Sequence, residues 1–180
     1  MDAKDPSTQR HSERVATLAG DIAAAQGWTN KGIADLRDAA LVHDVGKIGI
    51  PDAILLKPGS LTPEEYETIK THAHLGAEIA AEILSDEQVG WIRGHHERID
   101  GLGYPDGLAA AAIPDGARIL ALADSLEVMT GVRAYQRTVS WTDALEECRS
   151  EAGKQFDAVL VDLLPEIAPP GAVIAEPIVR

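Results

Sequence analysis

The sequence predicts an all-α fold, and three observations support this prediction. Apolar residues recur at steps of three and four along most of the chain, which is the period of a helix with one buried face. Signals that begin helices precede several of these stretches. The alternation of apolar and polar residues that marks a half-buried strand is not evident in the chain.

The first two helices are expected over residues 7–27 and from Thr29 to about residue 43. The apolar stripe of the first helix continues backwards to His11, and Gly27 ends it. Thr29 is a preferred N-cap residue for the second helix. Residues 44–60 follow with Gly and Pro at short intervals, which predicts a loop with short extended pieces.

Two helices in the middle of the chain are expected to begin with capping boxes. In the first box, the side chains of Thr62 and Glu65 satisfy each other's backbone N–H groups. The helix that it opens is expected to reach residue 84, with Ile79 and Ile83 on its inward stripe. A second box at residues 85–88 opens a helix that is expected to end near residue 96.

The last third of the chain is expected to hold one long helix and two shorter ones. Residues 97–113 are rich in Gly and Asp and predict a loop, after which Pro114 opens a helix to about residue 130. The final helices are expected over residues 138–152 and 155–167. Residues 1–167 are therefore interpreted as one domain, and residues 168–180 as an extended tail that is free to move.

The composition argues against two classes of partner. A net charge of −13 and a pI near 4.7 disfavour binding to nucleic-acid backbones and to anionic membranes. No segment approaches the roughly 20 apolar residues that span a bilayer. The N-terminus lacks the apolar core of a secretory signal.

The cysteine content indicates the redox state of the cellular compartment. Cys148 is the single cysteine and cannot form an intrachain disulfide, which indicates a reducing environment and a cytoplasmic protein. The sequence leaves open whether the chain is a complete protein or the output domain of a longer sensor protein, although its start almost at the first motif favours a fragment. The sequence leaves the oligomeric state open.

Histidines and aspartates fall at positions that are expected to face inward. A single histidine on a helix face is usually a hydrogen-bonded core residue, but burying several polar groups without shared partners costs free energy. A metal centre offers such partners. The inward candidates are three helix-face histidines, a pair at a helix end, and two aspartates: His11, His43, His72, His95, His96, Asp44 and Asp124.

Adjacent ligands favour more than one metal ion. Neighbouring residues of a helix point about 100° apart, so His95 and His96 serve two ions more easily than one. His43 and Asp44 are adjacent in the same way, and a carboxylate can bridge two ions. Two ions about 3.5–4 Å apart are common in phosphodiester hydrolysis. His and Asp ligands favour Fe or Mn, with Zn also compatible.

Several motifs of the chain resemble those of one family. HDVGKIGIP at residues 43–51 resembles the signature HDxGKIGIP, and HHERIDGLGYP at residues 95–105 resembles HHExxDGxGYP. Further matches are HSERV at 11–15, KPGSLTPEE at 57–65, the HxxxG at 72–76, IPDGARIL at 113–120 and AGKQFD at 152–157. Over about residues 5–165, this set is similar to the HD-GYP branch of the HD phosphohydrolase superfamily.

The resemblance implies a compact helical HD-domain fold and an enzyme that hydrolyses cyclic di-GMP to pGpG or GMP. It implies the metal ligands His11, His43, Asp44, His72, His95, His96 and Asp124. It also implies two catalytic groups, with Asp44 as the bridging ligand and Lys47 as a contact to the scissile phosphate. Tyr104 and Arg133 fall at positions that contact the nucleotide in relatives. A diguanylate cyclase or a sensor domain is the partner that it implies.

Three departures from the family pattern bear on the metal count and on the substrate. Members with three metals carry a glutamate where this chain has Ser7, so two metals are expected. Glu127 replaces a usual aspartate, and Gln136 replaces a usual basic residue. Two alternatives therefore stay open: a hydrolase of another cyclic dinucleotide such as cyclic GMP-AMP, and a catalytically weak module that senses a dinucleotide or docks onto a cyclase.

Overall fold

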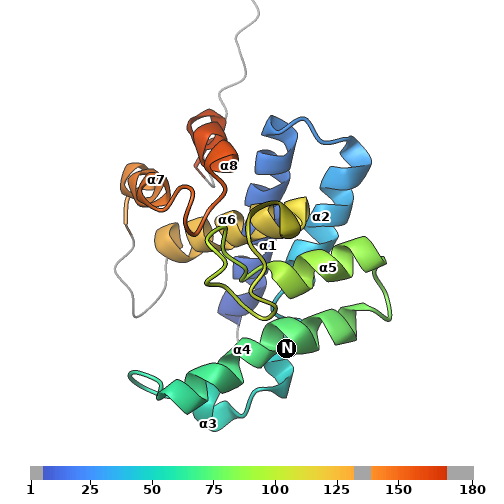
Figure 1. Cartoon of the computed structure of the whole chain (residues 1–180), viewed down its shortest axis with the longest axis vertical. Helices are drawn as coiled ribbons and strands as arrows, with labels where there is room; N and C mark the ends of the chain where they lie inside the picture. Colours follow the sequence, from blue (N-terminus) through green and yellow to red (C-terminus); the bar gives the residue numbers. More distant parts are fainter. Residues whose placement is uncertain (1–5, 132–138, 170–180) are drawn as a thin grey trace, which may run out of the picture.

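The computed structural model describes residues 6–131 and 139–169, and these residues are helical throughout the core (Figure 1). The described part contains no strand, only an isolated bridge between Ala152 and Phe156. The all-α prediction is therefore confirmed. The helices are α1 Pro6–Ala25, α2 Asn30–Val42, the 3-10 helix η1 Val45–Gly49, α3 Asp52–Leu55, α4 Pro63–Ala80, α5 Asp86–Gly94, η2 Ala110–Ala112, α6 Asp115–Thr130, α7 Trp141–Ser150, α8 Ala158–Leu163 and η3 Leu164–Glu166.

The predicted capping boxes begin α4 and α5. The Thr62 hydroxyl accepts from the Glu65 N–H, and the Glu65 carboxylate accepts from the Thr62 N–H at 2.7 Å. Ser85 and Gln88 repeat this arrangement at α5. Each box satisfies N–H groups that have no partner within the helix, which explains why these starts could be predicted locally.

Some helix bounds differ from the prediction. The helix expected to reach residue 84 ends at Ala80, and Ile79 and Ile83 are exposed, so their predicted place on the inward stripe is wrong. A turn after Ala80 leads to the Ser85 cap, while Leu84 packs against the core in place of the two isoleucines. Residues 44–60 hold the 3-10 helix η1 and the one-turn helix α3, where extended pieces were expected.

The last two α-helices begin later than predicted because side chains cap them further along the chain. The Ser140 hydroxyl accepts from the Asp143 N–H ahead of α7, and the Asp157 carboxylate accepts from the Val159 N–H ahead of α8. The predicted start at residue 138 lies outside the described residues, as does the predicted tail from residue 170 onwards.

Helix α6 runs through the middle of the molecule, with α1, α2 and α5 on one side and α7 and α8 on another (Figure 1). Its side chains from Ile119 to Leu126 include five that are almost fully buried. Small residues on α1 and α2, such as Ala19 and Ala39, let these two helices approach closely. The core is thus built mainly from aliphatic residues, and Trp91 is one of its few aromatic members.

A close backbone contact between η1 and α4 brings histidines from two separate segments of the chain together. Gly46 of η1 lies against the backbone of His72 and Gly76 on α4, and a Cβ at Gly46 would collide with both. Glycine is therefore required at this position. The contact brings His43 and Asp44, which precede η1, next to His72.

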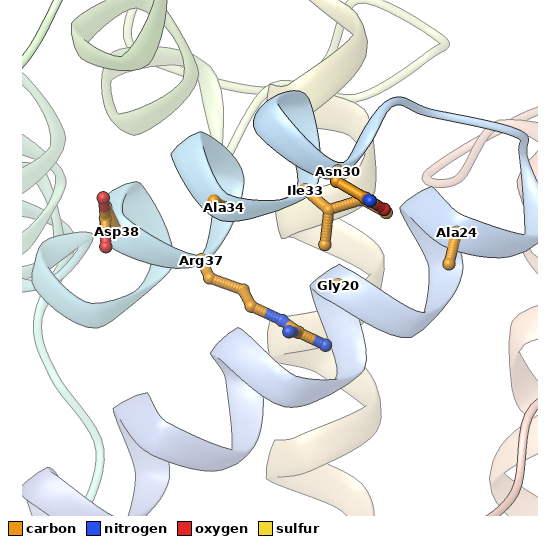
Figure 2. Close-up of a pocket in the computed structure, with 7 residues that line it drawn as sticks. All are labelled: Gly20, Ala24, Asn30, Ile33, Ala34, Arg37 and Asp38. Carbon is orange, nitrogen blue, oxygen red and sulfur yellow. The ribbon is translucent and has the colours of Figure 1, made fainter.

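A shallow groove of about 460 Å³ runs between α1 and α2, and Figure 2 shows its lining. Arg37 lies across it over Gly20, and its guanidinium is 3.6 Å from the Asp21 carboxylate. No histidine lines this groove. Among the described helices, none combines the length and the apolar composition needed to cross a bilayer.

Candidate metal centre

Side chains from five helices or their ends converge around Asp124 of α6. The predicted inward residues come from α1, the end of α2, α4, the end of α5 and α6, and they lie together in the structure: His11, His43, Asp44, His72, His95, His96 and Asp124. Ring centroids of His43 and His95 are 5.2 Å apart, and those of His72 and His95 are 5.4 Å apart. The convergence expected from the sequence is therefore present.

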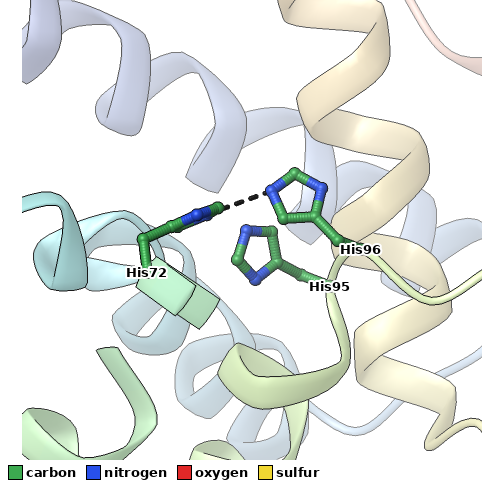
Figure 3. A group of neighbouring side chains, drawn as sticks. All are labelled: His72, His95 and His96. Atoms are coloured by element: carbon green, nitrogen blue, oxygen red, sulfur yellow. Dashed lines mark hydrogen bonds between the residues drawn. The ribbon is translucent and has the colours of Figure 1, made fainter. Parts of the chain in front are cut away.

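The converging side chains form two groups, each able to hold one ion. His72, His95 and His96 offer ring nitrogens within 4.8 Å of one another, and the Nε2 atoms of His72 and His96 lie 3.1 Å apart (Figure 3). His11, His43 and Asp44 form the second group, with ligand atoms that also lie within 4.8 Å of one another.

Asp44 lies between the two groups. Its Oδ1 atom is 3.5 Å from Nε2 of His72, and its Oδ2 atom is 3.6 Å from Nε2 of His43. One oxygen thus faces each group, so Asp44 could offer a ligand atom to an ion in either group. Asp124 adds a second carboxylate to the His11 group, with Oδ1 at 3.3 Å from Nε2 of His11 and 3.9 Å from Nε2 of His43.

Three of the imidazoles are held by their own helices. The Nδ1 atoms of His43, His72 and His95 donate to the carbonyl three residues earlier, at 2.7, 2.7 and 2.6 Å. This fixes the proton on Nδ1 and turns the Nε2 lone pair toward the centre. Such an arrangement of a ligand histidine and its backbone partner is frequent at metal sites.

Two buried nitrogen atoms test whether a metal fits. Nε2 of His43 and Nε2 of His95 are buried and have no hydrogen-bond partner within the described chain. A buried polar atom without a partner costs about 1–3 kcal/mol. A metal ion would supply that partner, so the residues present fit a metal centre.

Burial keeps the imidazoles of the first group uncharged. It lowers the pKa of His95 well below its usual value and lowers the pKa of His96 to about 3. It also lowers the pKa of His72. These imidazoles are therefore neutral near pH 7, which is the form that binds metals.

The carboxylates of the second group create a site for positive charge. Burial opposes ionisation of Asp44, but His43 and Lys47 hold its pKa well below the usual range. Burial also opposes a charge on His11, yet hydrogen bonds to Asp124 and Glu127 raise its pKa to about 9. The centre thus combines anionic carboxylates with imidazoles, which favours divalent cations.

A cavity of about 390 Å³ opens beside the centre. Its lining joins the predicted nucleotide contact Tyr104 to His95, His96 and Asp124. The Tyr104 ring stacks on His96 at a centroid distance of 4.7 Å, and Nζ of Lys47 donates to Oδ2 of Asp44 at 2.5 Å. Arg133, the other predicted contact, lies outside the described residues.

The loop that carries Tyr104 is held by a carboxylate that the sequence reasoning missed. Glu97 is buried and accepts from the backbone N–H groups of Asp106 at 2.7 Å and Leu108 at 3.0 Å. Gly103 packs so closely on the backbone of this loop that a Cβ would collide with it. The signal for Glu97 was its place directly after the histidine pair, at the start of a glycine-rich loop.

A second missed residue is Arg14, whose guanidinium pairs with Glu127. It lies three residues after His11, which places both on one face of α1. That spacing could have identified it.

The motif AGKQFD at residues 152–157 contacts the loop that carries Tyr104. The Lys154 carbonyl accepts from the Asp100 N–H at 2.9 Å, and the Gln155 side chain accepts from Arg98 at 3.0 Å.

Comparison with known proteins identifies relatives over most of the chain. A family model described as "HD domain" matches residues 1–160. A cyclic di-GMP phosphodiesterase of Thermotoga maritima is 43% identical over 162 residues, which cover 88% of this chain and 44% of that protein. The cyclic di-GMP phosphodiesterase response regulator RpfG of Xanthomonas campestris pv. campestris is 38% identical over 171 residues, covering 91% of this chain and 44% of that protein.

A relative with a different substrate in its name is nearly as similar. The 3'3'-cGAMP-specific phosphodiesterase 1 of Vibrio cholerae is 35% identical over 166 residues, covering 91% of this chain and 38% of that protein. The chain therefore spans less than half the length of these curated relatives. Among solved structures, the HDG"Y"P protein Bd1817 of Bdellovibrio bacteriovorus has a TM-score of 0.71 at 24% identity, covering 88% of this chain and 51% of that one.

Proposed function

The chain belongs to the HD domain family, in its HD-GYP branch, and on this premise we propose that it hydrolyses a cyclic dinucleotide, with cyclic di-GMP as the first candidate. One observation carries the proposal. Asp44 lies with one oxygen toward each of two imidazole groups, beside Lys47 and at the edge of a cavity. A paired metal centre next to a cationic side chain is suited to attack on a phosphodiester.

The two groups of side chains would hold two divalent ions, Fe or Mn before Zn. His72, His95 and His96 would hold one ion, and His11, His43 and Asp124 the other, with Asp44 between them. When bound, the ions would supply Lewis acidity toward the phosphate and toward the attacking water. The backbone hydrogen bonds of three of the histidines support the proposal, because they orient Nε2 before any ion arrives.

The reaction is a hydrolysis at phosphorus. Water adds to the phosphorus, the bond to the ribose 3′ oxygen breaks, and that oxygen leaves with a proton, which gives the linear dinucleotide pGpG. Lys47 would offset negative charge on the phosphate or on the leaving oxygen. Its ammonium group already lies 2.5 Å from Oδ2 of Asp44 and remains partly exposed. Tyr104 and Arg133 would contact the nucleotide.

A second candidate substrate is a cyclic GMP-AMP, and the name of the Vibrio cholerae relative supports it. Both substrates present the same phosphodiester to the centre, so the centre cannot distinguish them. A module that only senses the dinucleotide is less favoured, because all seven expected ligand side chains lie in or beside the two groups, which a module without catalysis would not need. We further propose that the chain acts in the cytoplasm beside a diguanylate cyclase or a sensor domain.

The test is hydrolysis by protein that has been reconstituted anaerobically with Fe(II) or Mn(II). Cyclic di-GMP and 3'3'-cyclic GMP-AMP are supplied separately, and products are separated by chromatography, with a chelator as control. Metal-dependent formation of pGpG or GMP from cyclic di-GMP is the expected result. Faster turnover of the mixed dinucleotide would reassign the substrate. Two bound metals without turnover of either would sink the enzymatic proposal in favour of the sensing module.

A further inference from the structure

We propose that Glu127 is a positioning residue that orients the imidazole of His11 toward one ion of the pair. The inference deepens the proposed function and rests on it, since it assigns a role toward the metal centre of that function. Glu127 lies on α6 and His11 on α1, and the Glu127 carboxylate accepts from Nδ1 of His11. The opposite ring atom, Nε2, is 3.3 Å from Oδ1 of Asp124 in the second group.

His11 differs from three other candidate ligands in how its ring is held. His43, His72 and His95 each donate Nδ1–H to a carbonyl of their own chain three residues earlier. Those hydrogen bonds are local and form when the helix forms. At His11, Nδ1 meets a side chain that is 116 residues away in the sequence, so the orientation of this ring depends on how α1 packs against α6.

Arg14 holds Glu127 in place from the other side. Its guanidinium donates to Oε1 of Glu127, while His11 donates to Oε2. The Glu127 side chain is only 4% exposed, whereas that of Arg14 is 38% exposed, so Arg14 covers the carboxylate at the surface. A buried carboxylate with two charge-capable partners has a fixed position. One carboxylate therefore ties two side chains of α1 to α6.

The end of α6 leaves room for this pair. Gly131 follows α6, and a Cβ there would collide with Nη2 of Arg14 and with Oε1 of Glu127. Any residue can adopt the φ of −70° at Gly131. The lack of space for a Cβ therefore explains the glycine, and the backbone conformation does not. The space at Gly131 lets the longer glutamate side chain reach His11 while Arg14 closes over it.

The experiment measures metal binding without turnover. Mn(II) is titrated into metal-free wild-type protein, Glu127→Ala and Glu127→Gln, and free Mn(II) is followed by electron paramagnetic resonance. In Glu127→Ala we expect binding of one of the two ions to weaken by about 10–100-fold, with the other ion within about twofold of wild type. Glu127→Gln keeps an acceptor for Nδ1, so its affinity for the weakened ion is expected to lie between those of wild type and Glu127→Ala.

The control is Glu146→Ala, which removes an exposed carboxylate of α7 and is expected to bind both ions as wild type does. Unchanged binding in both Glu127 variants would overturn the proposal. So would equal weakening of both ions together with a lower unfolding temperature of the metal-free variant, because that indicates a general structural role. Wild-type protein that binds two ions without hydrolysis refutes the proposed function but not the positioning role, whereas wild type without metal refutes both.

Discussion

His95 illustrates how much of the centre depends on single residues. Its ring is fully buried, its Nδ1–H is used by the Ile92 carbonyl, and its Nε2 has no partner among the described residues. A core histidine that only stabilised the fold would have both ring nitrogens satisfied. The unused Nε2, repeated at His43, is therefore the residue-level feature that separates a metal site from ordinary packing.

Lys47 and Asp44 are adjacent in space, but their substitution is expected to have different effects on metal content. Lys47→Ala removes a charge beside the centre and no ligand, so both metals should remain while kcat falls by about 10²–10³-fold. Asp44→Ala removes the carboxylate between the two groups, so metal content and activity should be lost together. Elemental analysis and turnover of the same samples check this. Loss of metal in Lys47→Ala would show that the lysine holds the site together.

Cys148 is expected to be inert in the folded protein. Its side chain is fully buried, and burial disfavours the thiolate and raises its pKa to about 12. The reactive thiolate is therefore scarce up to about pH 10. Mass spectrometry after iodoacetamide treatment at pH 8 should find no adduct in native protein and full modification in denaturant. Rapid modification of the native protein would mean that this part of the core opens.

At the scale of elements, the packing of η1 on α4 sets the distance between the two ligand groups. His43 and Asp44 end one helix just before η1, and His72 lies in the middle of α4. Gly46 allows the two backbones to touch. A larger residue there must push η1 away from α4, and this would separate Asp44 from His72.

Gly46→Ala tests this element contact. The added methyl group meets backbone atoms of His72 and Gly76, which cannot move aside as a side chain could. We expect a loss of about 1–3 kcal/mol in the free energy of unfolding and weaker binding of both ions. Urea unfolding and Mn(II) titration measure the two effects.

The matched control for this test is Gly90→Ala, because a Cβ at Gly90 has open space around it within α5. Alanine is the better helix former by about 1 kcal/mol, so this variant should be neutral or more stable than wild type. If Gly46→Ala and Gly90→Ala show the same stability and the same Mn(II) affinity, η1 and α4 can move apart at little cost, and their contact does not set the spacing of the ligands.

The candidate metal centre links helices from different parts of the molecule. Its candidate ligands come from α1, α2, α4, α5 and α6, and α6 is also the helix around which the core is packed. An ion that binds the folded chain and not the unfolded chain stabilises the fold by mass action. The centre is therefore expected to contribute to stability as well as to chemistry.

Removal of metal should lower the unfolding temperature. With free Mn(II) at about 100 times its dissociation constant, the native state gains about 2.7 kcal/mol for each independent site. For a domain of this size, this corresponds to roughly 5–10 °C per site. Differential scanning calorimetry with and without a chelator checks the shift. Asp44→Ala is the control, and a chelator should leave its unfolding temperature almost unchanged.

What the sequence alone determined was local. The caps at Thr62 and Ser85, the start of α6 after Pro114 and the inward direction of the histidines follow from contacts within a few residues, and these predictions are confirmed. The late starts of α7 and α8 were missed because several polar residues compete as caps. The exposure of Ile79 and Ile83 was missed because a periodic pattern does not show where a helix stops being covered.

Only the tertiary structure decided how the inward residues divide and what supports them. Asp44 faces two groups because η1 rests on α4, and Glu127 meets His11 across 116 residues of sequence. Glu97 holds the loop of Tyr104 through backbone N–H groups, which no residue pattern specifies. Helix periodicity fixes the direction of a side chain relative to its own helix, whereas the distance between side chains on different helices depends on how closely those helices pack.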